Sequence, residues 1–129
     1  MKKTLAALAL AGAIALAGCG SGGGGSTVDA ATWISEASQP GVTVIDVRTP
    51  AEFAAGHVEG AVNIDVQSPA FAAEIAALDK AQPYSLYCRS GNRSAVAMDQ
   101  MTEAGFTDVT NLDGGLEDLA AAGATVVQS

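Results

Sequence analysis

The chain of 129 residues has the length of one domain, since domains commonly run to about 100 to 200 residues. Hydrophobic residues make up 49% of it and aromatic residues only 5%, so we expect a core built from alanine, valine, isoleucine and leucine. The formal net charge of −8 at pH 7 argues against binding to nucleic acid and against electrostatic attraction to anionic lipid, because both partners are polyanions.

Residues 1–18 have the pattern of a secretory signal. Two lysines precede an uncharged run over residues 5–17, which is shorter than the roughly 20 residues that a helix needs to span a bilayer. The segment Leu16-Ala17-Gly18-Cys19 resembles a bacterial lipobox, which implies cleavage before Cys19 and a diacylglyceryl thioether on its sulfur. The alternative is an ordinary signal peptide cut near Ala17. We expect an exported protein that is lipid-anchored to the membrane of the bacterial cell envelope.

Residues 19–26 follow as the lipidated cysteine and a glycine- and serine-rich tether without apolar side chains. The folded domain is predicted over residues 27–129. Removal of the signal leaves four lysine and arginine side chains against 14 aspartates and glutamates, a formal charge of −10. Attachment to a membrane would therefore depend on the lipid on Cys19.

Strands and helices alternate along the predicted domain. Asp29 is a suitable N-cap for a first helix, which carries Trp33 and ends at residues 39–41. Strands are predicted at 42–47, 61–64, 84–87 and 108–112, and further helices at 50–55, 69–78, 92–104 and 116–122. The run at 42–47 is apolar almost throughout, which is typical of a strand covered on both faces. The alternation predicts an α/β domain with a mostly parallel sheet.

The segment with the most chemical information follows the third predicted strand. Cys88 comes directly after this strand and a helix begins a few residues later, so the thiol lies where open α/β sheets bind their ligands. Unpaired backbone N–H groups at the helix start, together with Arg89 and Arg93, are expected to lower the pKa of the thiol. If Cys19 carries lipid, Cys88 is the remaining thiol, and an unpaired cysteine in an exported protein suggests a reactive one.

The placement of positive charge supports the same site. The predicted domain has four cationic side chains, and two of them, Arg89 and Arg93, lie within five residues of Cys88. In an otherwise acidic protein, an anionic substrate is expected to bind there. The alternative is that the two arginines only pair with nearby carboxylates such as Asp46 or Asp99.

Three motifs follow one another along the predicted domain. The first covers residues 46–53 and 56–64, the second is Tyr87-Cys88-Arg89-Ser90-Gly91-Asn92-Arg93-Ser94, and the third combines residues 105–106 with 111–115. In order and spacing they resemble the motifs of rhodanese domains. The resemblance implies a single rhodanese-like domain with a five-stranded, mostly parallel sheet flanked by helices, and the transfer of a sulfane sulfur through a cysteine persulfide.

Carried over by position, the resemblance makes Cys88 the catalytic persulfide carrier. The substrate-binding residues would be those of the loop: Arg89, Ser90, Gly91, Asn92 and Arg93. Their backbone would cradle the outer sulfur, and the two arginines would orient a thiosulfate-like anion, for which forked guanidinium donors are suited. A thiol or cyanide would accept the sulfur. The resemblance implies no metal, no organic cofactor and a monomeric domain.

Two other functions are left open. One is a membrane-tethered persulfide carrier or sensor, which acts on a protein partner with little turnover of small molecules. The other is a phosphatase or arsenate reductase, whose loop places five residues between cysteine and arginine. Here four residues separate Cys88 from Arg93, and the shorter loop favours a single sulfur atom. One departure from the rhodanese pattern is Leu116, at a position where tryptophan is usual.

The remaining candidates are interpreted as structural. His57, the only histidine, is expected to brace a turn through a hydrogen bond and not to act as a base. Asp46 and Arg48 are expected to form a fold-bracing pair, and Trp33 to pack in the core. Four glycines, Gly56, Gly60, Gly114 and Gly115, suit turns that need a positive φ.

Overall fold

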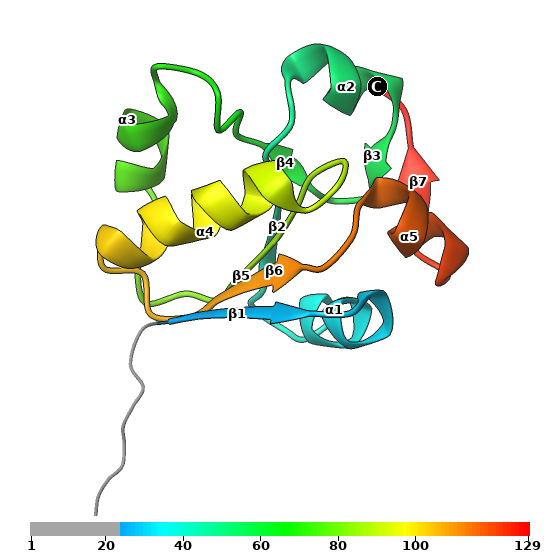
Figure 1. Cartoon of the computed structure of the whole chain (residues 1–129), viewed down its shortest axis with the longest axis horizontal. Helices are drawn as coiled ribbons and strands as arrows, with labels where there is room; N and C mark the ends of the chain where they lie inside the picture. The colour runs from blue at the N-terminus through cyan, green and yellow to red at the C-terminus, as the bar shows by residue number, and fades with distance from the viewer. Residues whose placement is uncertain (1–23) are drawn as a thin grey trace, which may run out of the picture.

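The computed structural model describes residues 24–129, and its centre is one parallel sheet. The five strands are β1 (Gly25–Val28), β2 (Thr43–Asp46), β4 (Val62–Asn63), β5 (Tyr84–Tyr87) and β6 (Val109–Leu112). They lie in the order β1-β6-β5-β2-β4, and every neighbouring pair is parallel (Figure 1). The predicted α/β fold with a five-stranded sheet is therefore confirmed.

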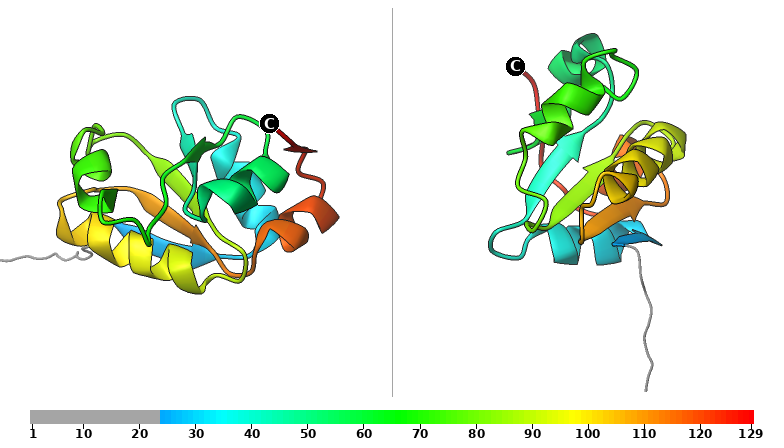
Figure 2. Two further views of the ribbon diagram at one scale, coloured as in Figure 1. Left: turned by 90° about the horizontal axis from the view of Figure 1, so that it is seen from above. Right: turned by 90° about the vertical axis from the view of Figure 1, so that its left-hand side faces the viewer.

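Helices cover both faces of this sheet. They are α1 (Ala30–Ala37), α2 (Pro50–Ala55), α3 (Phe71–Ala76), α4 (Asn92–Glu103) and α5 (Leu116–Ala121). α3 and α4 pack against one face, and α1 and α5 against the other (Figure 2). All predicted helices and strands are present. The ends of those predicted as ranges differ from the prediction by at most two residues, and α1 ends at Ala37, before the predicted stop at 39–41.

The core contains more aromatic surface than the composition suggests. Five of the six aromatic side chains are buried: Trp33, Phe71, Tyr84, Tyr87 and Phe106. The Trp33 ring N–H donates to the carbonyl of Leu86 at 2.9 Å, and its ring meets that of Tyr87 edge to face at 5.8 Å. Most of the other buried hydrophobic residues are alanine, valine, isoleucine and leucine, as expected, and the few large rings add to this core where helices meet the sheet. The core position of Trp33 is confirmed.

Strand β1 was not among the strands predicted from local patterns, and it begins within the segment that was assigned to the tether. Gly25 and Ser26, which were assigned to the tether, pair in register with β6. A Cβ on Gly24 would overlap the backbone of Thr107, and one on Gly25 would lie 2.9 Å from the sulfur of Met98. These glycines allow β1 to pack closely against its neighbours, so they belong to the folded domain and not to a linker. The predicted start of the folded domain is corrected to β1.

A second, antiparallel pair joins β3 (His57–Val58) to β7 (Val126–Val127) and was not predicted. Strands of two residues are too short to show the alternation of apolar and polar side chains that marks a strand. The pairing holds the C-terminal segment beside α2 and β3 (Figure 1).

The predicted signal segment, Cys19 and the first part of the tether fall within residues 1–23 and lie outside the described residues. Within residues 24–129, no helix combines the length and the apolar character needed to cross a membrane. Because the sheet is parallel, β1 starts at its amino edge, at the opposite end from the loop that follows β5 (Figure 1).

Candidate active site

Cys88 is the first residue after β5, and its side chain is fully buried at the carboxyl edge of the sheet. Its sulfur accepts hydrogen bonds from the backbone N–H of Gly91 at 3.0 Å and of Ser94 at 3.4 Å. The hydroxyl oxygen of Ser94 lies 3.3 Å from the same sulfur. Two backbone N–H donors thus converge on one atom, and the hydroxyl of Ser94, which also lies 3.2 Å from the carbonyl oxygen of Gly91, is within hydrogen-bonding distance as a third. This arrangement favours a thiolate, which only accepts hydrogen bonds, over a thiol.

The loop takes its shape from a residue in the left-handed region. Gly91 has φ 98° and ψ −15° and is the N-cap of α4. This conformation costs a residue with a Cβ about 1–2 kcal/mol, and it turns the Gly91 N–H toward the sulfur. α4 then begins at Asn92, so the N–H of Ser94 is one of the first-turn donors that have no partner inside the helix.

Burial is the largest single influence on the pKa of the Cys88 thiol, and it raises that pKa. The hydroxyl and N–H of Ser94, with the N–H groups of Ser90 and Gly91, outweigh burial and bring the pKa below its ordinary value. The predicted direction is confirmed. The backbone N–H donors that were expected are among its main causes, whereas the arginines that were expected beside them are not. No role was predicted for Ser94, although it closes the motif that contains Cys88.

Replacing Ser94 with alanine is expected to raise the pKa of the Cys88 thiol, because the hydroxyl donor is lost. The ultraviolet absorbance of the thiolate, followed against pH and corrected with a Cys88→Ala protein, measures the change. A hydrogen bond to a charged group contributes about 1.5 to 3 kcal/mol, so thiolate-dependent reaction at neutral pH should fall by about tenfold or more. A titration identical to that of the parent would show that the hydroxyl does not act on the sulfur.

The side chain of Arg93 is held by Glu52 of α2. Two guanidinium nitrogens of Arg93 donate to the two carboxylate oxygens at 2.7 and 3.0 Å. The hydroxyl of Thr49, the N-cap of α2, donates to Glu52 at 3.1 Å and accepts its backbone N–H at 3.3 Å. Arg93 therefore does pair with a carboxylate, but with that of Glu52 and not with Asp46 or Asp99.

The same ion pair predicts a dependence of stability on pH. Hydrogen bonding to Arg93 lowers the pKa of Glu52 to about 2, although burial opposes this. For a carboxyl group with a lowered folded-state pKa, the stabilisation is present above the ordinary pKa of 4.5 and is lost as the pH falls toward 2.

Glu52→Gln is accordingly expected to lower the free energy of unfolding at pH 7 by about 1 kcal/mol, a modest value because the pair is partly exposed. The difference between parent and variant should shrink as the pH falls through this window. Urea unfolding at pH 7 and near pH 2 measures both values. A difference that persists unchanged in acid would contradict the assignment.

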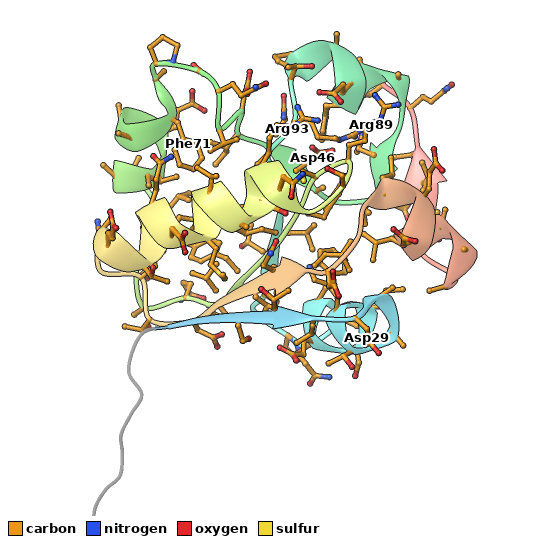
Figure 3. The ribbon with its side chains drawn as sticks, viewed as in Figure 1. Asp29, Asp46, Phe71, Arg89 and Arg93 are labelled. Carbon is orange, nitrogen blue, oxygen red and sulfur yellow. The ribbon has the colours of Figure 1, made fainter. Side chains whose placement is uncertain are left out.

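The remaining loop residues have different surroundings. Arg89, Ser90 and Asn92 are exposed at the outer rim of the loop. Within the part of the chain that the structure describes, Arg89 forms no ion pair. Arg89 and Arg93 both lie on the side of the loop that faces α2 (Figure 3). The structure thus brings all the predicted loop residues around Cys88 and leaves Arg89 as the arginine available to an anion.

Two structural predictions are confirmed beneath the loop. A guanidinium nitrogen of Arg48 lies 2.6 Å from a carboxylate oxygen of Asp46, and both residues are buried. The hydroxyl of Tyr87 donates to the same carboxylate at 2.6 Å. The Nδ1–H of His57 donates to the carbonyl of Phe53 at 2.8 Å, and the two rings stack at 3.7 Å. These contacts brace the chain around the carboxyl ends of β2 and β5.

The end of the third motif and the residue that follows it contact the backbone of the active-site loop. The N–H of Leu116 donates to the carbonyl of Cys88 at 3.1 Å. A Cβ on Gly115 would overlap the carbonyl of Arg89. Gly114 has the expected positive φ of 126°, whereas Gly115 has φ −144°. The expectation for Gly115 is corrected: the close approach of the loop backbone, and not a left-handed turn, requires glycine there.

Gly115→Ala is expected to lower the free energy of unfolding by about 1 to 3 kcal/mol, because the added methyl group displaces either the loop or α5. Gly56→Ala is a matched control, since its backbone is extended and its Cβ would meet only the side chain of Val126 at 3.5 Å. Chemical denaturation of both variants measures the difference. Equal stability of the two variants would show that the contact at Gly115 is not tight.

The fold and the site together define a class of protein. A cysteine at the carboxyl edge of a five-stranded parallel sheet is held in a short loop of N–H donors. The family model of the rhodanese-like domain matches residues 30–122, which include all five helices and the loop. The chain belongs to the rhodanese-like domain family, and it is an enzyme of the rhodanese type.

Similar proteins include the thiosulfate sulfurtransferase GlpE of Pseudomonas aeruginosa, which is 39% identical over 84 residues, covering 65% of this chain and 74% of the relative. The thiosulfate sulfurtransferase PspE of Escherichia coli is 38% identical over 76 residues, covering 59% and 72%. Among solved structures, the rhodanese-like domain of the Anabaena protein Alr3790 is 25% identical, with a TM-score of 0.71 over 80% of this chain and 79% of that one. A rhodanese with anions from E. coli is 33% identical, with a TM-score of 0.57 over 68% and 99%.

Proposed function

We propose that the chain is a sulfurtransferase that takes a sulfane sulfur from thiosulfate, or a similar small anion, and carries it as a persulfide on Cys88. The observation that supports this most directly is the convergence of the Gly91 N–H and the Ser94 N–H and hydroxyl on the Cys88 sulfur. The thiolate is the nucleophilic form of cysteine, and these donors stabilise it. The names of the relatives support thiosulfate as the donor.

In the first half-reaction, the Cys88 thiolate attacks the sulfane sulfur of thiosulfate. The new S–S bond forms as the S–S bond of thiosulfate breaks, and sulfite leaves with the electron pair. The negative charge of the thiolate passes to the outer sulfur of the persulfide, where N–H groups of residues 89–93 can receive it. Arg89 is positioned to pair with the incoming anion.

In the second half-reaction, a thiolate or cyanide attacks the outer sulfur. The bond between this sulfur and Cys88 breaks, and its electron pair returns to Cys88 as the thiolate. The product is a persulfide or thiocyanate. Neither half-reaction needs a metal, an organic cofactor or an external oxidant, since each exchanges one bond to sulfur for another.

Thiocyanate formation from thiosulfate and cyanide by the full chain, purified under reducing conditions, tests this function. Steady turnover is the expected result. Stoichiometric sulfite release without turnover would instead favour the alternative of a persulfide carrier that serves a protein partner. Absence of both sulfite and thiocyanate would contradict sulfur transfer through Cys88.

We also propose that the protein is exported and anchored by lipid on Cys19, as the lipobox-like segment suggests. β1 starts at the amino edge of the sheet and Cys88 lies at the carboxyl edge, so an anchor that precedes β1 would leave the active site facing away from the membrane. Cells that express the parent and Cys19→Ala proteins, labelled with radioactive palmitate, test the anchor. Label is expected in the parent alone, and equal label in both proteins would contradict the proposal.

A further inference from the structure

A cavity of about 260 Å³ lies beside the active-site loop. It is lined by residues of the loop, of α2 and of α5, and by one residue that follows β2: Arg48, Glu52, Ala55, Arg89, Leu116 and Glu117. Two features connect it to the reacting residue. Arg89 is the chain neighbour of Cys88, and the N–H of Leu116 donates to the carbonyl of Cys88 at 3.1 Å. A molecule in this cavity therefore lies next to the backbone that carries the sulfur.

The charged groups that line the cavity differ in their availability. Arg48 is paired with the buried Asp46, and the carboxylate of Glu52 holds Arg93. Arg89 and Glu117 are exposed, and within residues 24–129 neither forms an ion pair. One cation from the loop and one carboxylate from α5 thus remain available, with Ala55 and Leu116 as the apolar part of the lining. This combination suits a ligand that carries both charges.

We propose that the cavity binds the sulfur acceptor, and that the acceptor is a small zwitterionic thiol of the amino-acid type. Its carboxylate pairs with Arg89, its ammonium group pairs with Glu117, and its methylene group lies against Leu116. The inference rests on the proposed sulfur transfer and deepens it, because it names the class of acceptor. Cyanide has no ammonium group and uses only a small part of this space.

The transfer step conserves atoms and charge. The thiolate of the bound acceptor attacks the outer sulfur of the Cys88 persulfide and forms a new S–S bond. The bond between that sulfur and Cys88 breaks, its electron pair returns to Cys88, and the acceptor leaves as its own persulfide. Arg89 serves the anionic donor in the first half-reaction and, after sulfite has left, the acceptor carboxylate in the second.

A comparison of acceptors tests the proposal with the full chain and saturating thiosulfate. Cysteine carries both charges, whereas 3-mercaptopropionate lacks the ammonium group. In Glu117→Gln, the ratio of kcat/KM for cysteine to that for 3-mercaptopropionate is expected to fall about two- to fivefold, the effect of losing one partly exposed ion pair. Glu103→Gln removes the same charge from the exposed end of α4 and should leave the ratio unchanged. An equal ratio in all three proteins would overturn the proposal.

A binding measurement separates this inference from the proposed function. S-methylcysteine carries the same two charges but no reactive thiol, and its binding is followed through the backbone amide chemical shifts of the full chain. Shifts are expected at Ala55, Leu116 and Glu117, with weaker binding in Glu117→Gln. No shift at these residues would overturn the inference even if thiocyanate forms. Binding at these residues without any sulfur transfer would refute the proposed function and leave the ligand class of the cavity standing.

Discussion

Cys88→Ala is expected to form no thiocyanate from thiosulfate and cyanide and to release no sulfite. Both half-reactions use the same sulfur atom, first as the nucleophile and then as the leaving group. Within residues 24–129, no second cysteine is present to replace it. The expected loss of kcat/KM is at least about a thousandfold, in the range seen when an enzyme loses its nucleophile. Steady-state assays with the full chain measure it.

Cys19→Ala is the matched control for this variant. It removes the other cysteine of the chain, which precedes the folded domain, and should leave turnover intact. Circular dichroism should show the same secondary structure in both variants, because the loss of one small side chain leaves the surrounding core in place. Appreciable thiocyanate formation by Cys88→Ala would remove Cys88 from the mechanism.

Arg48→Met is expected to lower the free energy of unfolding by about 3–5 kcal/mol, because it leaves the buried carboxylate of Asp46 without its cation. Burial first, and then the hydrogen bond to Asp46, raise the pKa of Tyr87, so its hydroxyl stays protonated and remains a donor to that carboxylate. One hydroxyl does not replace a guanidinium group that donates to both carboxylate oxygens. Urea unfolding at pH 7 gives the value.

The double variant Asp46→Asn with Arg48→Met distinguishes a stranded charge from lost packing. Removal of both charges should recover a large part of the stability that Arg48→Met loses, since breaking a buried pair costs more than replacing it. If Arg48→Met lowers the free energy of unfolding by less than about 1 kcal/mol, the ion pair contributes little to stability and does not brace the loop.

The fold could be predicted largely from local patterns. The apolar run at 42–47 is long enough to identify a buried strand, and Asp29 caps α1 as predicted. β3 and β7 could not be predicted, because their two-residue strands depend on a pairing between distant parts of the chain. Strand β1 was also missed, for another reason. Gly25 gives no hydrophobic signal, and glycine suits this position because a side chain would come too close to Met98.

The site could be predicted only in part. The position of Cys88 after a strand was visible in the sequence, because a loop between a strand and a helix is a local feature. The ion pair between Glu52 and Arg93 joins residues 41 positions apart, so no local spacing pattern predicts it. Ser94 lies in the same motif, but that its hydroxyl faces the sulfur follows from the left-handed turn at Gly91. Arg89 is identified as the cation without an ion pair among residues 24–129 only after Arg93 is seen to pair with Glu52.

The most direct test of the account is the mass of the full chain after reaction with thiosulfate in the absence of an acceptor. If Cys88 carries the sulfur, its peptide is expected to gain one sulfur atom, matched by one equivalent of sulfite, and to lose that sulfur when cyanide is added. Sulfite release without a sulfur on Cys88, or a sulfur that cyanide does not remove, would contradict it.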